Sequence, residues 1–143
     1  MNYFTSIKNN PLVTDFVLLI IRIFIGFAMI THGLPKLQKL LDGGEIQFFN
    51  FLGLGTKFSL GLTVFSEFFC SIFIILGLFS RWASFFLFFT MLVVAFVVHG
   101  GDAFSDREIG FLYMAIYLVL LAFGPGKYSV DGMISRRKED DGW

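Results

Sequence analysis

The sequence predicts an all-α membrane protein: a four-transmembrane-helix up-down bundle, with a short interfacial helix as one option for its first loop. Of its 143 residues, 56% are hydrophobic and 19% aromatic, and the mean hydropathy is +0.76. Charged residues make up 15% of the chain, against roughly 25% in an average soluble protein. A soluble domain of this length cannot bury so much apolar surface, so lipid is the expected solvent.

The first observation behind this fold is a set of four long apolar runs. They are Leu12–His32, Phe58–Phe79, Trp82–His99 and Ile109–Phe123. A membrane-spanning helix needs about 20 mainly apolar residues, and the runs lack the two-residue alternation of a membrane β-barrel. The first helix is expected to end before Pro35, a helix breaker. The last run is short, so its helix is expected to begin near Asp106 or to lie partly in the interface.

The second observation is the length of the links, which are Gly33–Lys57, Ser80–Arg81 and Gly100–Glu108. The two-residue link makes its flanking helices antiparallel neighbours, and four helices joined in this way place both termini on one side. The first link is long and contains several phenylalanines and leucines. It predicts either an amphipathic helix at the membrane surface or a cap over the mouth of the bundle.

Lysine and arginine counts predict the orientation. The terminal side has six, namely Lys8, Arg81, Lys127, Arg136, Arg137 and Lys138, and the other side has four, namely Lys36, Lys39, Lys57 and Arg107. This bias favours cytoplasmic termini. We therefore divide the chain into a cytoplasmic N-terminal segment (1–11), a four-helix membrane domain (12–131) and a charged cytoplasmic tail (132–143), which is expected to fray from Arg136 onward.

The same composition excludes several function classes. The net charge is zero, which argues against nucleic acid binding. One cysteine, Cys70, and two histidines are too few for a disulfide or a metal site. The chain contains no phosphate-binding loop, dinucleotide fingerprint or Ser/His/Asp pattern. Catalysis by this polypeptide alone would therefore depend on a bound quinone or on the cofactor of a partner.

Two charged residues, Arg22 and Glu67, fall well inside apolar runs. A charge at the bilayer centre costs about 2.5–3.5 kcal/mol even on the mildest scale. Their similar predicted depth favours a direct ion pair, and Gly26 and Gly33 near the Arg22 face would allow close helix packing. Two interpretations stay open: a pair that only locks the bundle, or a polar core that binds a quinone head group, a thiol compound or a proton.

Other polar residues extend this candidate site. Tyr113 and Tyr117 lie one helical turn apart, where they would hydrogen-bond either a quinone carbonyl or a neighbouring helix. An outer polar cluster is expected at one membrane level, formed by His32, Lys36, His99 and Glu108. This cluster would transfer protons or hold an anionic group, unless it is ordinary interfacial polarity.

At this point the order of motifs resembles a known family. Arg22–Gly26 followed by His32–Leu37 is similar to the first-helix signature of DoxX proteins. Further matching segments follow in order: Phe51–Gly55, Glu67, Gly77–Arg81, His99, Glu108 and Gly124–Asp131. The resemblance extends over about Leu12 to Asp131.

The resemblance implies a bacterial or archaeal inner-membrane protein with four helices. The family takes its name from a small subunit associated with a terminal quinol oxidase and with thiosulfate:quinone oxidoreductase activity, and some members are linked to thiol stress through partner proteins. Carried over residue by residue, it points to Arg22, His32, Lys36, Glu67, Arg81 and Glu108, together with the packing glycines Gly26 and Gly33.

The sequence is therefore consistent with three alternative functions. The first is a redox-associated subunit, enzymatic or not, that handles a quinone or a small sulfur or thiol compound in the bundle interior. The second is a non-catalytic membrane subunit that recruits or stabilises partner proteins. The third is a small transporter, which the lack of an inverted repeat and of a Gly/Pro break in mid-span disfavours. Lipid is the expected environment, quinone the expected cofactor if there is one, and homo-oligomerisation stays open.

Overall fold

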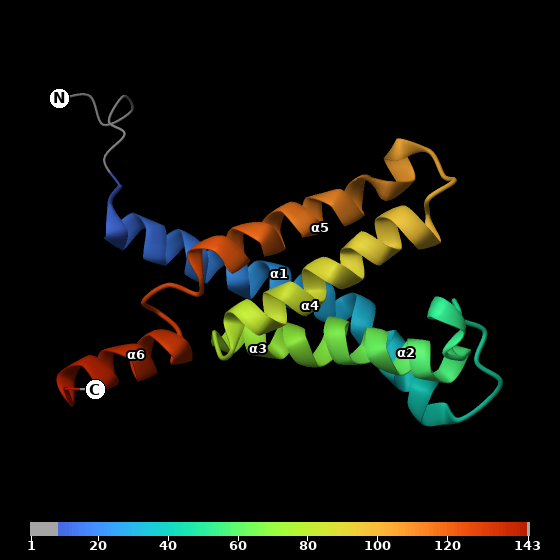
Figure 1. Ribbon diagram of the computed structural model, residues 1–143, viewed down its shortest axis with the longest axis horizontal. Helices are drawn as coiled ribbons and strands as arrows, with labels where there is room; N and C mark the ends of the chain where they lie inside the picture. Colours follow the sequence, from blue (N-terminus) through green and yellow to red (C-terminus); the bar gives the residue numbers. More distant parts are fainter. Residues whose placement is uncertain (1–8, 143) are drawn as a thin grey trace.

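The computed structural model describes residues 9–142, and the regular structure of that part of the chain is helical throughout. The chain first forms the long helix α1 (Pro11–Asp42) and returns through α2 (Thr56–Val64), the π-helical segment η3 (Phe65–Cys70) and α3 (Ser71–Leu76). It continues through α4 (Ser80–Val93), the π-helical segment η4 (Val94–Val98), α5 (Phe104–Phe123) and α6 (Val130–Asp140) (Figure 1). The expected segment 1–11 lies mostly outside the described residues.

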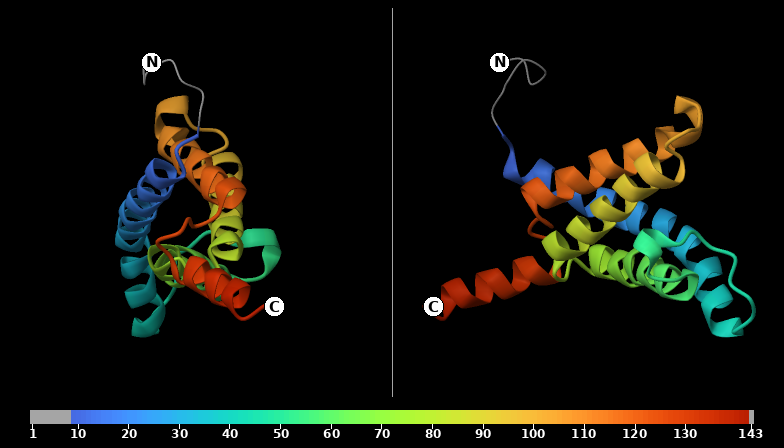
Figure 2. Two further views of the ribbon diagram at one scale, coloured as in Figure 1. Left: turned by 90° about the vertical axis from the view of Figure 1, so that its left-hand side faces the viewer. Right: turned by 45° about the vertical axis from the view of Figure 1, so that its right-hand side comes forward.

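The helices form two antiparallel pairs that cross each other (Figures 1 and 2). One pair is α1 with the α2–η3–α3 segment, and the other is the α4–η4 segment with α5. The start of α1, the turn between α3 and α4, and the end of α5 lie at one end of the molecule, here called the terminal end. Residues 43–55 and 99–103 lie at the other, here called the loop end, so successive segments run in opposite directions as expected.

Three helical stretches in the described part of the chain are long and apolar enough to cross a membrane: Pro11–Asp42, Thr56–Leu76 and Ser80–Val98. Helix α5 has 20 residues and begins at Phe104, upstream of the apolar run as the sequence suggested. Every 18-residue stretch of it contains the three charged residues Asp106, Arg107 and Glu108. The protein is thus an all-helical membrane protein by these criteria, with three spans shown rather than the four expected.

Helix α1 does not end before Pro35, so that prediction is wrong. It continues through Pro35 to Asp42, where Gly43 ends it in the left-handed conformation at φ 68°. An internal proline costs about 3 kcal/mol in an ordinary helix. Here tertiary contacts on both sides offset this cost, because Gly33 packs against the η3 backbone and Lys36 forms an ion pair with Glu67. Membrane helices tolerate proline where neighbouring helices supply such contacts.

The close approach of α1 to the second span depends on two glycines, as the sequence predicted. A β-carbon on Gly33 would lie 2.9 Å from the backbone carbonyl carbon of Glu67. A β-carbon on Gly26 would overlap the side chain of Ile75. Both glycines are buried, and small residues of this kind let membrane helices pack backbone to backbone.

The first link caps the bundle rather than forming an interfacial helix. Its first ten residues belong to α1, residues 45–50 have no helical structure, and the 3-10 turn η2 (Phe51–Gly53) follows. Lys39 Nζ donates to the Gln47 carbonyl at 2.6 Å, and the Phe51 amide donates to Ser59 Oγ at 2.9 Å. These bonds hold the link against the loop end of the bundle.

The segment that follows α5 is tied to the terminal end. The Asp131 carboxylate accepts hydrogen bonds from the amides of Phe79 and Ser80, both at 2.9 Å, and so caps the start of α4. Asp15 Oδ1 accepts the Lys127 amide at 2.9 Å. The tail expected to fray from Arg136 is instead helical, because α6 extends to Asp140.

Candidate functional site

The structure does not pair Arg22 with Glu67, so the expected ion pair is wrong. Arg22 Nη2 donates to the Tyr128 carbonyl at 2.6 Å, and its guanidinium packs against Gly77 at the terminal end. Gly77 lies ten residues after Glu67, or about 15 Å along a helix at 1.5 Å per residue. The two residues differ in depth because α1 begins well beyond the α3–α4 turn, so the ends of neighbouring helices are not level (Figure 1).

Glu67 pairs instead with Lys36. Lys36 Nζ lies 2.7 Å from Oε1 and 2.6 Å from Oε2 of Glu67, so both carboxylate oxygens are engaged. The Glu67 side chain is 2% exposed and that of Lys36 is 31% exposed. A buried carboxylate needs such compensation. The continuation of α1 beyond Pro35 supplies it, because it carries Lys36 to the level of η3.

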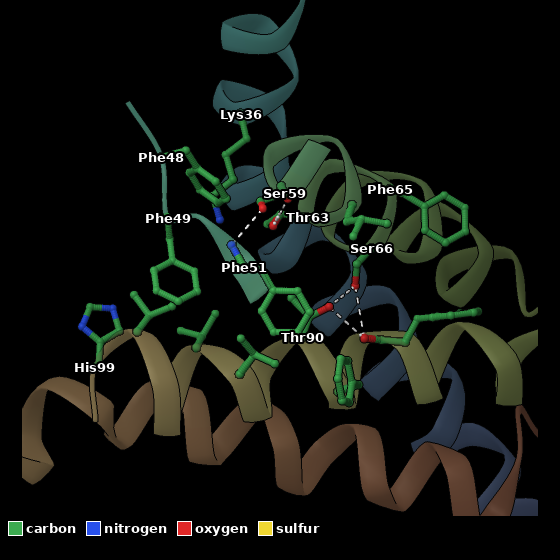
Figure 3. A pocket seen from close by; sticks show the side chains of 16 residues that line it. Lys36, Phe48, Phe49, Phe51, Ser59, Thr63, Phe65, Ser66, Thr90 and His99 are labelled. Atoms are coloured by element: carbon green, nitrogen blue, oxygen red, sulfur yellow. Dashed lines mark hydrogen bonds between the residues drawn. The ribbon is translucent and has the colours of Figure 1, made fainter. Parts of the chain in front are cut away.

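The pair lies beside a cavity of about 480 Å³ between the first link, the α2–η3 segment and the α4–η4 segment (Figure 3). We call it the aromatic cavity. Its sixteen lining residues are Lys36, Phe48, Phe49, Phe51, Ser59, Leu62, Thr63, Phe65, Ser66, Phe86, Phe89, Thr90, Val93, Val94, Val98 and His99. Most of them are apolar, and six are phenylalanines.

The hydroxyl groups of the threonine and serine side chains around the aromatic cavity form hydrogen bonds within the protein. Thr63 Oγ1 donates to the Ser59 carbonyl at 2.9 Å, and Thr90 Oγ1 donates to the Phe86 carbonyl at 2.8 Å. Ser66 Oγ lies 2.6 Å from Thr90 Oγ1. Among the side chains of this lining, two donors are left for a ligand: the third N–H of Lys36, and a ring nitrogen of His99, whose Nδ1 lies 2.7 Å from Asp102 Oδ2.

A second cavity, of about 210 Å³, lies on the other side of Lys36 and His99. We call it the polar cavity. It is lined by Met29, His32, Lys36, Glu67, Met91, Val94, Ala95, His99, Asp106, Arg107, Ile109, Gly110 and Tyr113. Lys36, Val94 and His99 line both cavities and form the wall between them.

Both π-helical segments border these cavities. The segment η3 contains Ser66 and Glu67, and η4 ends at the residue before His99. A π turn inserts an extra residue into an α-helix, is rare, and occurs often at functional sites. The two π turns therefore lie at, or directly before, the candidate site residues Glu67 and His99.

The structure divides the predicted site residues differently from the buried polar core and the outer polar cluster expected from the sequence. The residues around the polar cavity are His32, Lys36, Glu67, His99 and Tyr113. The residues that line neither cavity are Arg22, Arg81, Glu108 and Tyr117. Tyr117 is buried in the core, stacked on Tyr113 at 6.2 Å between ring centroids, and Glu108 is exposed. Arg81 lies close to Gly124 at the terminal end.

Sequence reasoning missed Asp106 and Arg107 as lining residues and did not assign the first link's phenylalanines to a cavity. The three-residue charged run before the last apolar run was the available signal for the first omission. For the second, it was the aromatic run at Phe48 and Phe49.

Comparison with known proteins identifies the family. The DoxX family model matches residues 17–100, which include most of α1, the Lys36–Glu67 pair and His99. The chain belongs to the DoxX family. The predicted resemblance is therefore confirmed, and it agrees with an integral membrane protein built of apolar helices. Neither a curated protein nor a solved structure matches the chain. In this DoxX protein the matched region ends before α5.

Proposed function

We propose that this DoxX protein is a redox-associated membrane subunit that binds a quinone in the aromatic cavity, with the quinone head group against Lys36 and His99. The observation that carries the proposal is the distribution of polarity in this cavity. A predominantly apolar space of about 480 Å³, lined by six phenylalanines, has its free side-chain hydrogen-bond donors on two residues, Lys36 and His99. Ligand sites of this kind bind an apolar body and orient it through a few placed polar groups.

The chemistry of the free groups selects the ligand class. Lys36 and His99 can donate hydrogen bonds, whereas the hydroxyls of Thr63, Ser66 and Thr90 are engaged within the protein. The ligand must therefore present an acceptor, as a quinone carbonyl does. A small hydrophilic sulfur compound would leave most of the phenylalanine lining without a partner. The cavity thus favours a quinone over a sulfur or thiol compound.

The position of the cavity favours access from the lipid. Phe65, Phe86 and Phe89 line it and are 44%, 42% and 47% exposed. In a membrane these exposed rings would face acyl chains. A quinone with an isoprenoid tail could then enter between η3 and α4 and leave its tail in the bilayer.

The proposal also covers the membrane topology, namely whether α5 crosses the bilayer and on which side the termini lie. Helix α5 packs along α4 and is the fourth long helical segment of the bundle (Figure 1). Its charged first turns lie at the loop end, near the polar cavity, rather than in the middle of the helix. We therefore propose α5 as a fourth span, with both termini cytoplasmic in a bacterial inner membrane as the lysine and arginine bias predicts.

The test is binding of a short-tailed ubiquinone analogue to the purified protein in lipid nanodiscs, measured by equilibrium dialysis. Lys36→Met removes one donor, and a hydrogen bond to a charged group contributes about 1.5–3 kcal/mol, so the Kd should rise roughly 10- to 100-fold. Lys57→Met is the matched control, because Lys57 is an exposed loop-end lysine that lines neither cavity. Saturable binding that is equal in both variants, or no saturable binding at all, would contradict the proposal.

A further inference from the structure

The polar cavity has a different character from the aromatic cavity. We infer that it is a water-filled inlet through which protons pass from the loop-end surface to Lys36, and from there to the ligand in the aromatic cavity. The inlet itself is independent of the ligand; its delivery of a proton to a bound quinone rests on the proposed function.

The first argument is the chemistry of the lining. Seven of the thirteen residues around the polar cavity carry titratable groups, against two of the sixteen around the aromatic cavity. They come from three helical elements and one loop: His32 and Lys36 from α1, Glu67 from η3, Asp106, Arg107 and Tyr113 from α5, and His99 after η4. The residues from α4 and η4 are apolar, namely Met91, Val94 and Ala95. A space lined in this way offers water several hydrogen-bond partners at each position.

The second argument is access to water. At the mouth of the cavity, His32 and Asp106 are exposed and Ile109 is 63% exposed. At its inner end, Glu67, Ala95 and Met29 are at most 2% exposed. The space of about 210 Å³ between these levels is large enough for several water molecules. Arg107 Nε is buried and has no hydrogen-bond partner among the described residues, and water in this space would supply one.

The third argument is the shared wall. Lys36 lines both cavities, and its ammonium group is held by both oxygens of Glu67 on the polar side. In the transfer, an N–H bond of Lys36 breaks and an O–H bond forms on an oxygen of the quinone anion, which is produced when an electron-donating partner protein reduces the bound quinone. Glu67 takes a proton from hydronium in the inlet and returns it to the Lys36 amine. The net result is one proton moved from loop-end water to the ligand, with both side chains restored.

The test is the reactivity of a cysteine placed on the inner wall, in the full chain with Cys70→Ala, reconstituted in liposomes. Ala95→Cys and Ala83→Cys are a matched pair, because both alanines are buried in the same helical span at 1% and 3% exposure, and only Ala95 lines the cavity. A membrane-impermeant methanethiosulfonate reagent added at the loop end should modify Ala95→Cys at least about tenfold faster than Ala83→Cys, because a thiol buried in apolar surroundings is inert.

Met91→Cys is the second variant, since Met91 also lines the cavity and its replacement adds no volume next to Gly110. If both cavity cysteines react as slowly as Ala83→Cys, or react only from the terminal end, the inlet is refuted even where quinone binds. If they react quickly while no quinone binds, the inlet stands and the proposed function fails.

Discussion

The Lys36–Glu67 pair permits a quantitative prediction, because the two partners differ in burial. Lys36→Met should leave the Glu67 carboxylate, 2% exposed, without its counter-charge. Breaking a buried pair by removing one partner costs about 3–5 kcal/mol. Lys36 is 31% exposed, so water reaches part of the pair, and we expect the lower end, about 3 kcal/mol of unfolding free energy. The double variant Lys36→Met/Glu67→Met should recover most of this loss, because neither charge is then buried alone.

The assay is reversible unfolding in mixed micelles, followed by the change in helical circular dichroism, for the wild type, both single variants and the double variant. The double-mutant cycle isolates the interaction between the two side chains from their separate contributions. Lys57→Met controls for the loss of one positive charge at the loop end. A coupling energy below about 0.5 kcal/mol, within ordinary additivity, would refute the reasoning that Glu67 depends on Lys36.

Two further predictions follow from packing and topology. Gly33→Val should lower the unfolding free energy by about 1–3 kcal/mol, because overpacking at a rigid contact is destabilising and the new β-carbon would lie 2.9 Å from the η3 backbone. The control is Gly44→Val, which should be close to neutral in the same unfolding assay, because a β-carbon there meets nothing within 4 Å. If α5 spans the membrane, cysteines at Gly101 and Asp140 should be labelled from opposite faces of intact vesicles by an impermeant maleimide, whereas labelling from one face would show that α5 does not cross.

Much of the fold could be predicted from the sequence, because lipid imposes strong constraints on composition and run length. The apolar runs locate the helices to within a few residues, except where the chain itself overrides a local rule. Pro35 is such an exception. Proline disfavours a helix interior, but Gly33 and Lys36 on either side of it make tertiary contacts that the sequence pattern does not reveal. The helical tail is another, since its start depends on bonds between residues far apart in the chain, such as that of Asp131 with Phe79.

The partners of the buried charges could not be predicted, for a geometric reason. A depth predicted from the position of a residue in its apolar run assumes that neighbouring helices begin at the same level. Helix α1 extends beyond its neighbours at the terminal end and, past Pro35, also reaches far into the loop end. Arg22 is thereby level with Gly77, and Lys36 with Glu67. The resulting offset of about 15 Å between Arg22 and Glu67 replaces the expected ion pair with the one between Lys36 and Glu67.

The two intramembrane charges therefore have different roles, although the cost of burial is similar for both. Arg22 is 1% exposed, is bonded to the Tyr128 carbonyl, interacts electrostatically with Asp131, and lines neither cavity. Its Nη2 ties the segment after α5 to α1, whereas its Nε and Nη1 are buried without a hydrogen-bond partner among the described residues. Glu67 holds the one cation shared by an aromatic cavity and a polar cavity. We therefore propose that a buried charge in this DoxX protein marks a site where it borders a space that a ligand or water can occupy, as Glu67 does, and serves as a structural tie where it bonds to the chain, as Arg22 does through Nη2.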